Sequence, residues 1–72
     1  MADSEDHLAR AERHVREGAN RIADLKTRIA ELELHGHQSA VAVAKELLHT
    51  LEKSQKLAIE HLRIERKWHP RS

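Results

Sequence analysis

Histidine is the residue type in this sequence that is best suited to chemistry. The chain has seven histidines among 72 residues, and imidazole both ligates metals and titrates near neutral pH. His7, His14 and His61 form the best candidate group, because a chain folded back on itself places His14 and His61 on one side. Their spacing is not that of a zinc protease, and no partner is evident that would orient them. We therefore predict no metal site and no cofactor.

Two further roles for the histidines stay open. His35 and His37 flank a turn and could chelate a metal adventitiously, and His61, Glu65 and His69 recur at intervals of four residues, on one helix face. The other role is pH sensing, because several histidines near one end of a bundle could gain charge together below about pH 6.5 and loosen an interface. The prediction that we prefer is that the histidines are ordinary surface residues of helices.

Enzymatic chemistry has little support in this sequence. The chain has no Cys and no Tyr, no glycine-rich phosphate loop, and no serine beside a histidine and a carboxylate in a recognisable turn. A straight helical hairpin also lacks the concave pocket that an active site usually needs. We predict that the protein is not an enzyme and has no catalytic residues.

The elements that position these side chains follow from residues at heptad spacing. Two rows step by three and four residues without a break. They are Leu8, Ala11, Val15, Gly18, Ile22, Leu25, Ile29 and Leu32, and then Val41, Ala44, Leu48, Leu51, Gln55, Ala58, Leu62 and Glu65. When the chain folds back at Gly36, positions whose numbers add to 73 meet, and large residues face small ones in several layers. The pattern predicts an all-α fold, an antiparallel two-helix hairpin similar to a coiled coil.

Capping residues and helix breakers predict where the helices begin and end. Residues 1–72 form one domain, with helix one over about 4–35, a turn over 36–38, helix two over about 39–68 and a short basic tail over 69–72. Asp3 or Ser4 is the expected cap of helix one, with Asp6 in its first turn, and Ser39 has the best capping chemistry for helix two. Pro70 marks the end of helix two, because the residue before a proline disfavours helix.

Gly18 is the one helix breaker inside helix one. A glycine in a helix interior costs about 0.5–1 kcal/mol relative to alanine. Its place in the seam, opposite Gln55, suggests that it lets that longer side chain or the opposing backbone come close. The alternative is that Gly18 is simply a tolerated small residue.

Helix two carries a second apolar row that the seam cannot cover. The row also steps by four and three residues and lies about 100° around the helix from the seam. Its large apolar members, which we call the strip, are the predicted interface residues: Val43, Leu47, Leu57, Ile64 and Trp68. Helix one has no equivalent row. We predict a homodimer through helix two, which would give a four-helix bundle, and the alternative is docking of the strip on a different protein.

Composition limits the kinds of partner. The formal net charge is +1, and charged residues of both signs make up 35% of the chain, which gives no global field for polyanions. The absence of Cys excludes disulfides and fits a reducing cytoplasm. No apolar run approaches the roughly 20 residues of a membrane span, and none resembles a secretory signal. We expect a cytoplasmic protein without a membrane partner.

Nucleic acid is the runner-up partner. The end of helix two is locally basic, with Arg63, Arg66, Lys67 and Arg71, and Trp68 could stack on a base. On helix one, acidic residues alternate with the arginines and cancel their field. The sequence therefore predicts a small protein-interaction or oligomerisation module without catalytic activity, and the alternative is a small regulatory RNA-binding helical bundle.

Three stretches of the chain resemble a group of short uncharacterised proteins that is widespread in proteobacteria. The stretches are HLARAERHVREG (7–18), RIADLKTRIAELELHGH (21–37) and AKELLHTLEKSQKLAIEHL (44–62). The group shares an A-E-R-H-x-x-E-G opening, an I-A-x-L-E…G-H turn and an L-L-x-T-x-E-x-S/T second helix. The resemblance implies a bacterial helical hairpin and carries over no activity, ligand or catalytic residue. The group often has Asp where this chain has Gln38, which moves the expected cap of helix two to His37 or Ser39.

Overall fold

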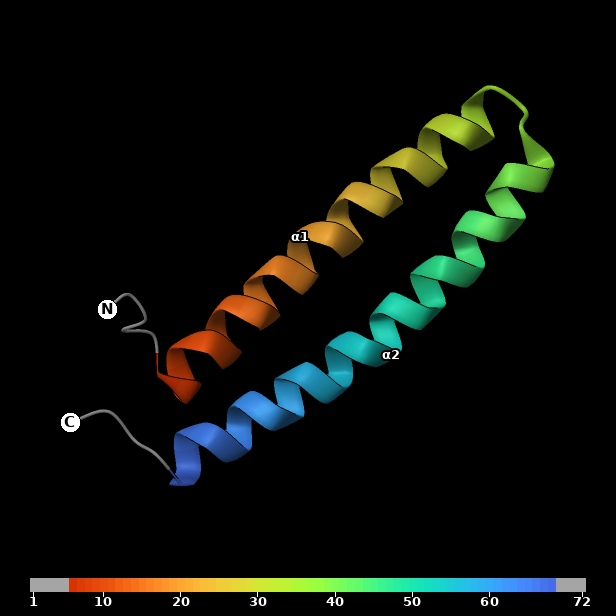
Figure 1. The fold of residues 1–72 in the computed structure, drawn as a ribbon. Coiled ribbons are helices and arrows are strands. Elements are labelled where there is room, and N and C mark those ends of the chain that lie inside the picture. Colours follow the sequence, from red (N-terminus) through yellow and green to blue (C-terminus); the bar gives the residue numbers. More distant parts are fainter. Residues whose placement is uncertain (1–5, 69–72) are drawn as a thin grey trace.

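The chain folds into an antiparallel hairpin of two long helices (Figure 1). The computed structural model describes residues 6–68. Helix α1 spans His7–Leu34 and helix α2 spans Gln38–Trp68, and the two lie side by side along their length. The predicted all-α hairpin is confirmed, and the described residues contain no strand.

The start of α1 differs from the prediction. Asp6 is the N-cap, with extended backbone, and its side chain accepts a hydrogen bond of 2.7 Å from the backbone N–H of Ala9. The expectation of a helix from about residue 4 with Asp6 in its first turn is therefore wrong. Aspartate caps as well as serine does, and Leu8, the first seam residue, follows directly. Asp3 and Ser4 lie outside the described residues.

The turn between the helices depends on Gly36. Its φ of 75° is left-handed, which favours glycine because a Cβ would be strained there. The N–H of His37 donates to the carbonyl of Leu32 at 3.0 Å, and that of Gly36 donates to Glu33 at 3.2 Å. These two hydrogen bonds form a Schellman motif, which provides donors for carbonyls in the last turn of α1.

The start of α2 decides between the two predicted caps, His37 and Ser39. The carbonyl of His37 accepts from the N–H of Val41 at 2.9 Å, and α2 begins at Gln38. Ser39 is therefore a helical residue and not the cap, and the turn occupies 35–37 rather than 36–38. Because the Schellman motif already fixes His37, the second helix starts immediately after it.

The core of the hairpin is the predicted seam. All sixteen seam positions are buried or half-buried, and among the other described residues only Ala9 and Glu12 are not fully exposed. Five are buried, with exposed fractions of 5–9%: Leu8, Ala11, Ile29, Ala44 and Leu62. No described side chain is completely buried, because each helix is covered on one side only.

The shape of the molecule follows from this single seam. The hairpin is a layer of 51 × 25 × 15 Å, one helix thick, with a radius of gyration of 16.1 Å. A compact domain of this length would have a radius of gyration of about 11 Å. The two broad faces of the layer therefore stay open. Neither helix of the described chain is long and apolar enough to cross a membrane.

Gly18 lies against the side chain of Gln55 across the seam. A Cβ placed on Gly18 would overlap the amide oxygen of Gln55 and lie 3.0 Å from its Cδ. The amide Nε2 of Gln55 donates to the carbonyl of Val15 at 2.8 Å. Glycine thus leaves room for a half-buried side chain that bonds to the backbone of the opposite helix. This contact supports the first of the two interpretations of Gly18.

Two ion pairs connect the helices on one flank of the seam. Lys45 pairs with Glu33 at 3.2 Å near the turn, and Arg66 pairs with Glu12 at 3.6 Å near the open end. The lysine and arginine are more than half exposed, and exposed pairs contribute roughly 0–1 kcal/mol each. The seam, rather than these pairs, holds the hairpin together.

A double-mutant cycle tests the Gly18–Gln55 contact. In a Gln55→Ala background, Gly18→Ala should raise the free energy of unfolding by about 0.5–1 kcal/mol, because alanine favours helix. In the native background the new Cβ displaces the Gln55 amide, and the lost hydrogen bond, worth about 0.5–1.5 kcal/mol, should cancel that gain. Urea unfolding of the four proteins measures the coupling. Equal stabilisation by Gly18→Ala in both backgrounds would contradict the contact.

Candidate functional site

The strip predicted on α2 lies open in the structure. The exposed fractions are 67% for Val43, 51% for Leu47, 72% for Leu57, 52% for Ile64 and 71% for Trp68. The strip lies along one side of a single helix, and the seam covers none of its members fully. A row of large apolar side chains in water is typical of an interaction surface.

The middle of the same row is polar. Thr50 and Ser54 separate Leu47 from Leu57, and the hydroxyl of Thr50 donates to the carbonyl of Glu46 at 3.2 Å. Because this hydroxyl already has an acceptor within its own helix, it can face another apolar surface at little cost. The row therefore has large apolar side chains toward both ends. Between Leu47 and Leu57 it has a small side chain, Ser54, and a hydroxyl that is already hydrogen-bonded, that of Thr50.

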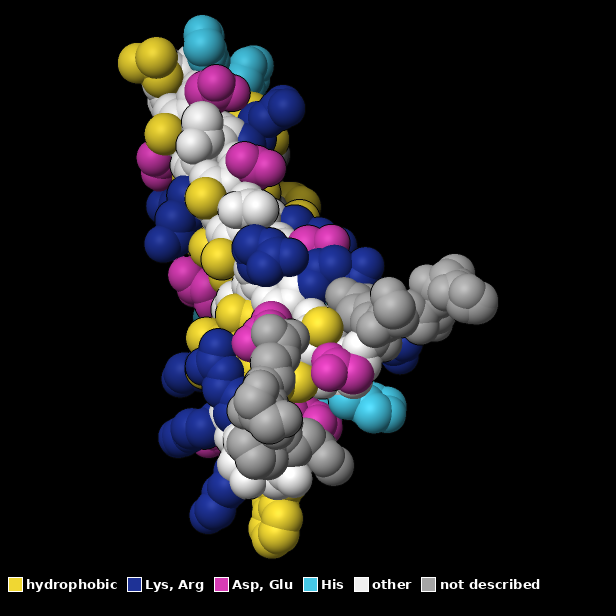
Figure 2. All heavy atoms as spheres, turned by 90° about the vertical axis from the view of Figure 1, so that its left-hand side faces the viewer, with side chains coloured by type: hydrophobic (Ala, Val, Ile, Leu, Met, Phe, Trp, Pro, Cys, Tyr) yellow, Lys and Arg dark blue, Asp and Glu magenta, His cyan; other side chains and the backbone are white. Residues whose placement is uncertain are grey.

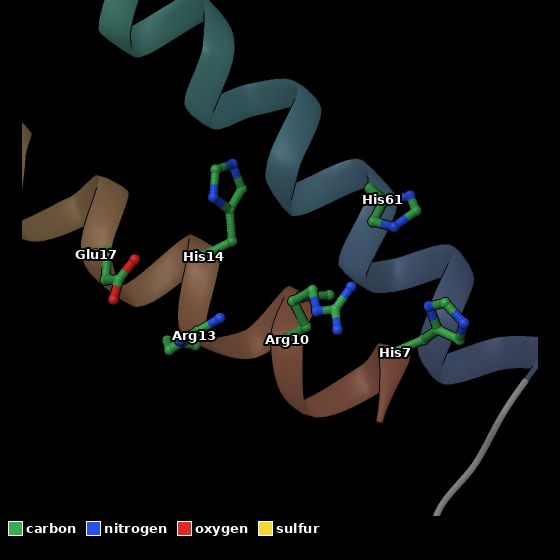
Figure 3. A pocket seen from close by; sticks show the side chains of 7 residues that line it. His7, Arg10, Arg13, His14, Glu17 and His61 are labelled. Atoms are coloured by element: carbon green, nitrogen blue, oxygen red, sulfur yellow. The ribbon is translucent and has the colours of Figure 1, made fainter. Parts of the chain in front are cut away.

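The candidate histidine group lines a groove at the open end of the hairpin (Figure 3). His7 and His14 come from α1 and His61 from α2, and the groove, of about 410 Å³, is also lined by Arg10 and Glu17. The structure thus brings the three histidines to one side of the seam. Among the described residues, however, no three side chains of His, Asp or Glu are placed to hold one metal ion.

His61 has a partner within its own helix. Its Nε2 lies 3.5 Å from a carboxylate oxygen of Glu65, which forms an ion pair when the imidazole is protonated. This contact confirms that His61 and Glu65 share a face. The third member of the predicted row, His69, lies outside the described residues.

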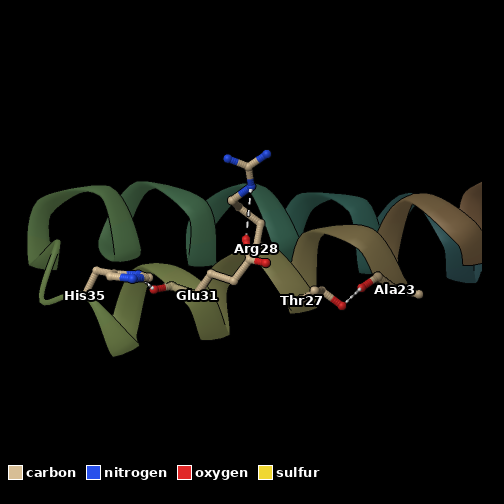
Figure 4. Close-up of polar contacts among 5 residues, drawn as sticks. All are labelled: Ala23, Thr27, Arg28, Glu31 and His35. Atoms are coloured by element: carbon tan, nitrogen blue, oxygen red, sulfur yellow. Dashed lines mark hydrogen bonds and ion pairs between the residues drawn. The ribbon is translucent and has the colours of Figure 1, made fainter.

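The turn contains two histidines that could serve as metal ligands, His35 and His37. The ring centroids of His35 and His37 are 6.3 Å apart, and the planes are inclined by 31°. The Nδ1 of His35 lies 2.8 Å from the carbonyl of Glu31 (Figure 4). Since a carbonyl only accepts, Nδ1 carries the proton and is not available as a metal ligand.

Polar side chains elsewhere on α1 bond within the helix. Thr27 donates to the carbonyl of Ala23 at 3.2 Å, and Arg28 lies 3.9 Å from Glu31 (Figure 4). These contacts are local, between residues three or four positions apart. They belong to the polar surface of the helix and do not form a shared binding site.

The basic end of α2 is partly neutralised. Arg63 pairs with Glu60 at 3.6 Å, and Arg66 pairs with Glu12 of α1 at the same distance. On the face shown in Figure 2, lysine and arginine side chains are interspersed with aspartate and glutamate. Lys67 is exposed, and Arg71 lies outside the described residues. Mixed charge of this kind gives a weak field for a phosphate backbone.

Ile59 is an exposed apolar residue of α2 that was not among the predicted interface residues. This residue is 50% exposed and lines a shallow groove of about 620 Å³ with Leu57 and three charged residues, Lys56, Glu60 and Arg63. Its heptad position is that of Lys45 and Arg66, on the flank of the seam that carries the two interhelical ion pairs, so Ile59 is not a member of the strip even though it shares this groove with Leu57. An isolated apolar residue in a charged row is the signal that could have identified it, but single exposed residues of this kind are common.

Comparison of the chain with protein-family models, with curated proteins and with solved structures finds no match. The likeness to the proteobacterial group therefore stays a prediction.

Zinc titration tests whether the histidine groove holds a metal. A site saturated at 100 times its dissociation constant would add about 2.7 kcal/mol to stability, and hence on the order of 10 °C to the melting temperature. Because no three ligands converge, we expect neither zinc nor a chelator to change the melting temperature appreciably. A zinc-dependent rise of that size, abolished by His14→Ala, would contradict this prediction.

Proposed function

We propose that this protein is a helical association module without catalytic activity, and that it works by binding a second copy of itself through the strip on α2. The observation that carries the proposal is the exposure of five large apolar side chains along one helix face, each 51–72% open. Pairing two hairpins through this face would form a four-helix bundle.

The thin core supports this proposal. Only five described residues are buried, and none is completely so. A chain of this size that lacks disulfides gains stability from oligomerisation more readily than from its own small core. Covering the strip would convert a one-layer structure into a two-layer one, in which the side chains of α2 are enclosed on two sides.

The proposal is preferred to RNA binding because of where the charges lie. Two of the three described basic residues at the end of α2 pair with glutamates at 3.6 Å. The five side chains of the strip, by contrast, are each 51–72% exposed. Loss of apolar contact with water is the larger driving force, and the surface that offers it is the strip.

Charge substitutions in the strip test the proposal, with Ile59→Glu as a matched control. Leu47 and Ile59 are equally exposed, at 51% and 50%, on the same helix, but only Leu47 belongs to the strip. Leu47→Glu and Leu57→Glu should reduce the solution mass to that of a monomer at micromolar concentration, because the charge would be buried in the interface. Ile59→Glu should leave the mass unchanged. Sedimentation equilibrium measures all four proteins.

Two outcomes would overturn the proposal. If Leu47→Glu and Leu57→Glu keep the mass of the native protein, the strip is idle surface. If the native protein itself is a folded monomer, self-association is wrong, and the strip is free for a different protein whose groove it fills.

A further inference from the structure

We infer that the second copy lies antiparallel on the strip, about a two-fold axis that passes between residues 55 and 56, so that positions whose numbers add to 111 meet. The inference rests on the proposed function and specifies its geometry. It follows from the order of residues in the row, from the charges beside the row, and from the area of the face.

The ends of the row are self-complementary in this register. Val43 meets Trp68 of the second copy, and Leu47 meets Ile64 of the second copy. By symmetry each pair occurs twice, so four layers join apolar side chains that are more than half exposed in a single chain. A two-fold interface requires such reciprocal pairing, because the same surface acts on both sides.

The centre of the row matches as well. Thr50 meets His61 of the second copy, two polar side chains that already have partners in their own helices. Ser54 meets Leu57 of the second copy next to the axis, where a small side chain leaves room for a large one. The register therefore pairs apolar with apolar, polar with polar and small with large.

Neighbouring registers leave apolar residues unpaired. A shift by one heptad, to numbers that add to 104, would place Trp68 opposite Gly36 in the turn and Ile64 opposite Ala40. A shift to 118 would place Val43 and Leu47 beyond the end of α2 at Trp68. The sum of 111 alone overlaps the strip along its full length.

The charges on α1 agree with an axis in this position. The groove shared by His14, Glu17 and His61 shows that one side of α1 lies beside the strip, and Arg21 and Asp24 continue these rows seven residues on. In the seam, positions of α1 and α2 whose numbers add to 73 lie opposite each other. The proposed axis, between residues 55 and 56 of α2, is therefore level with residues 17 and 18 of α1.

The same axis brings opposite charges of α1 together. Asp24 lies level with Arg10 of the second copy to within one residue. Glu17 approaches its own copy near the axis and lies within one helical turn of Arg21 of the second copy, which offsets that repulsion. The alternative stacking, α2 on α1 of the second copy, would instead bury the strip against charged rows.

The area of the face is sufficient for a stable dimer. The strip from 43 to 68 is about 38 Å long at 1.5 Å per residue, and a layer two helices wide adds about 20 Å across. The product is close to the roughly 800 Å² per partner of a standard interface.

Single cysteines test the register, because the chain has no Cys of its own. With the axis at 55–56, the two copies of Ser54→Cys lie about 4.5 Å apart along the helix, within reach of a disulfide. The two copies of Thr50→Cys lie about 16 Å apart, which is too far. Both positions are polar and belong to the same row, so each serves as the control for the other.

We expect Ser54→Cys to form a disulfide-linked dimer on mild oxidation and Thr50→Cys to stay unlinked. A mixture of Thr50→Cys and His61→Cys should be linked, because these positions meet in the proposed register. Reduced samples are first checked for helicity by circular dichroism and for native mass by sedimentation, so that only variants that fold and associate are compared.

The outcomes separate the register from the proposed function. If the mass is that of a dimer but Thr50→Cys links as readily as Ser54→Cys, the helices are parallel or shifted by a heptad, and the register is wrong. A dimer in which Ser54→Cys does not link also overturns the register. A native mass equal to that of a monomer overturns both the register and the proposed function.

Discussion

The described chain has only one seam to pack, and the rest of the structure depends on that constraint. Two helices share a single line of contact, so each covers the other on one side and leaves the remaining surface in water. The five buried residues all lie on this line. A fold of this kind is elongated and thin, and its free energy of unfolding is correspondingly small. Any further stabilisation must come from outside the hairpin.

Within the seam, one polar contact defines how the helices align. An aliphatic heptad seam tolerates sliding by a heptad, because one Leu or Ile layer resembles the next. The half-buried bond from Gln55 to the carbonyl of Val15, at 2.8 Å, exists only where a glycine makes room. A shift would leave the glutamine amide without its acceptor and press it against a larger side chain. This contact and the short turn at Gly36 together select one register.

The sequence was sufficient to predict the seam, the turn glycine and the strip, for one physical reason. Heptad spacing specifies which face of a helix is buried, and in a two-helix fold no other element competes for it. The helix ends were less predictable. Asp3, Ser4 and Asp6 have equivalent capping chemistry, and the seam ahead of Leu8 gives no further information. At the turn, the sequence left His37 and Ser39 open as caps of α2, and the Schellman bonds select His37. The histidines could be placed on one side of the hairpin, but the distances that decide whether they share an ion depend on side-chain geometry.

Because the strip is open, self-association through it would also stabilise the fold. If two copies cover each other's strips, unfolding releases two chains, and the melting temperature must depend on the total protein concentration. The most direct measurement is thermal unfolding of the native protein from about 1 to about 100 µM, followed by circular dichroism. For a dimer held together through the strip, we expect a melting temperature that rises steadily with concentration. A reversible transition at the same temperature throughout that range would show that the hairpin folds alone, and would contradict the account.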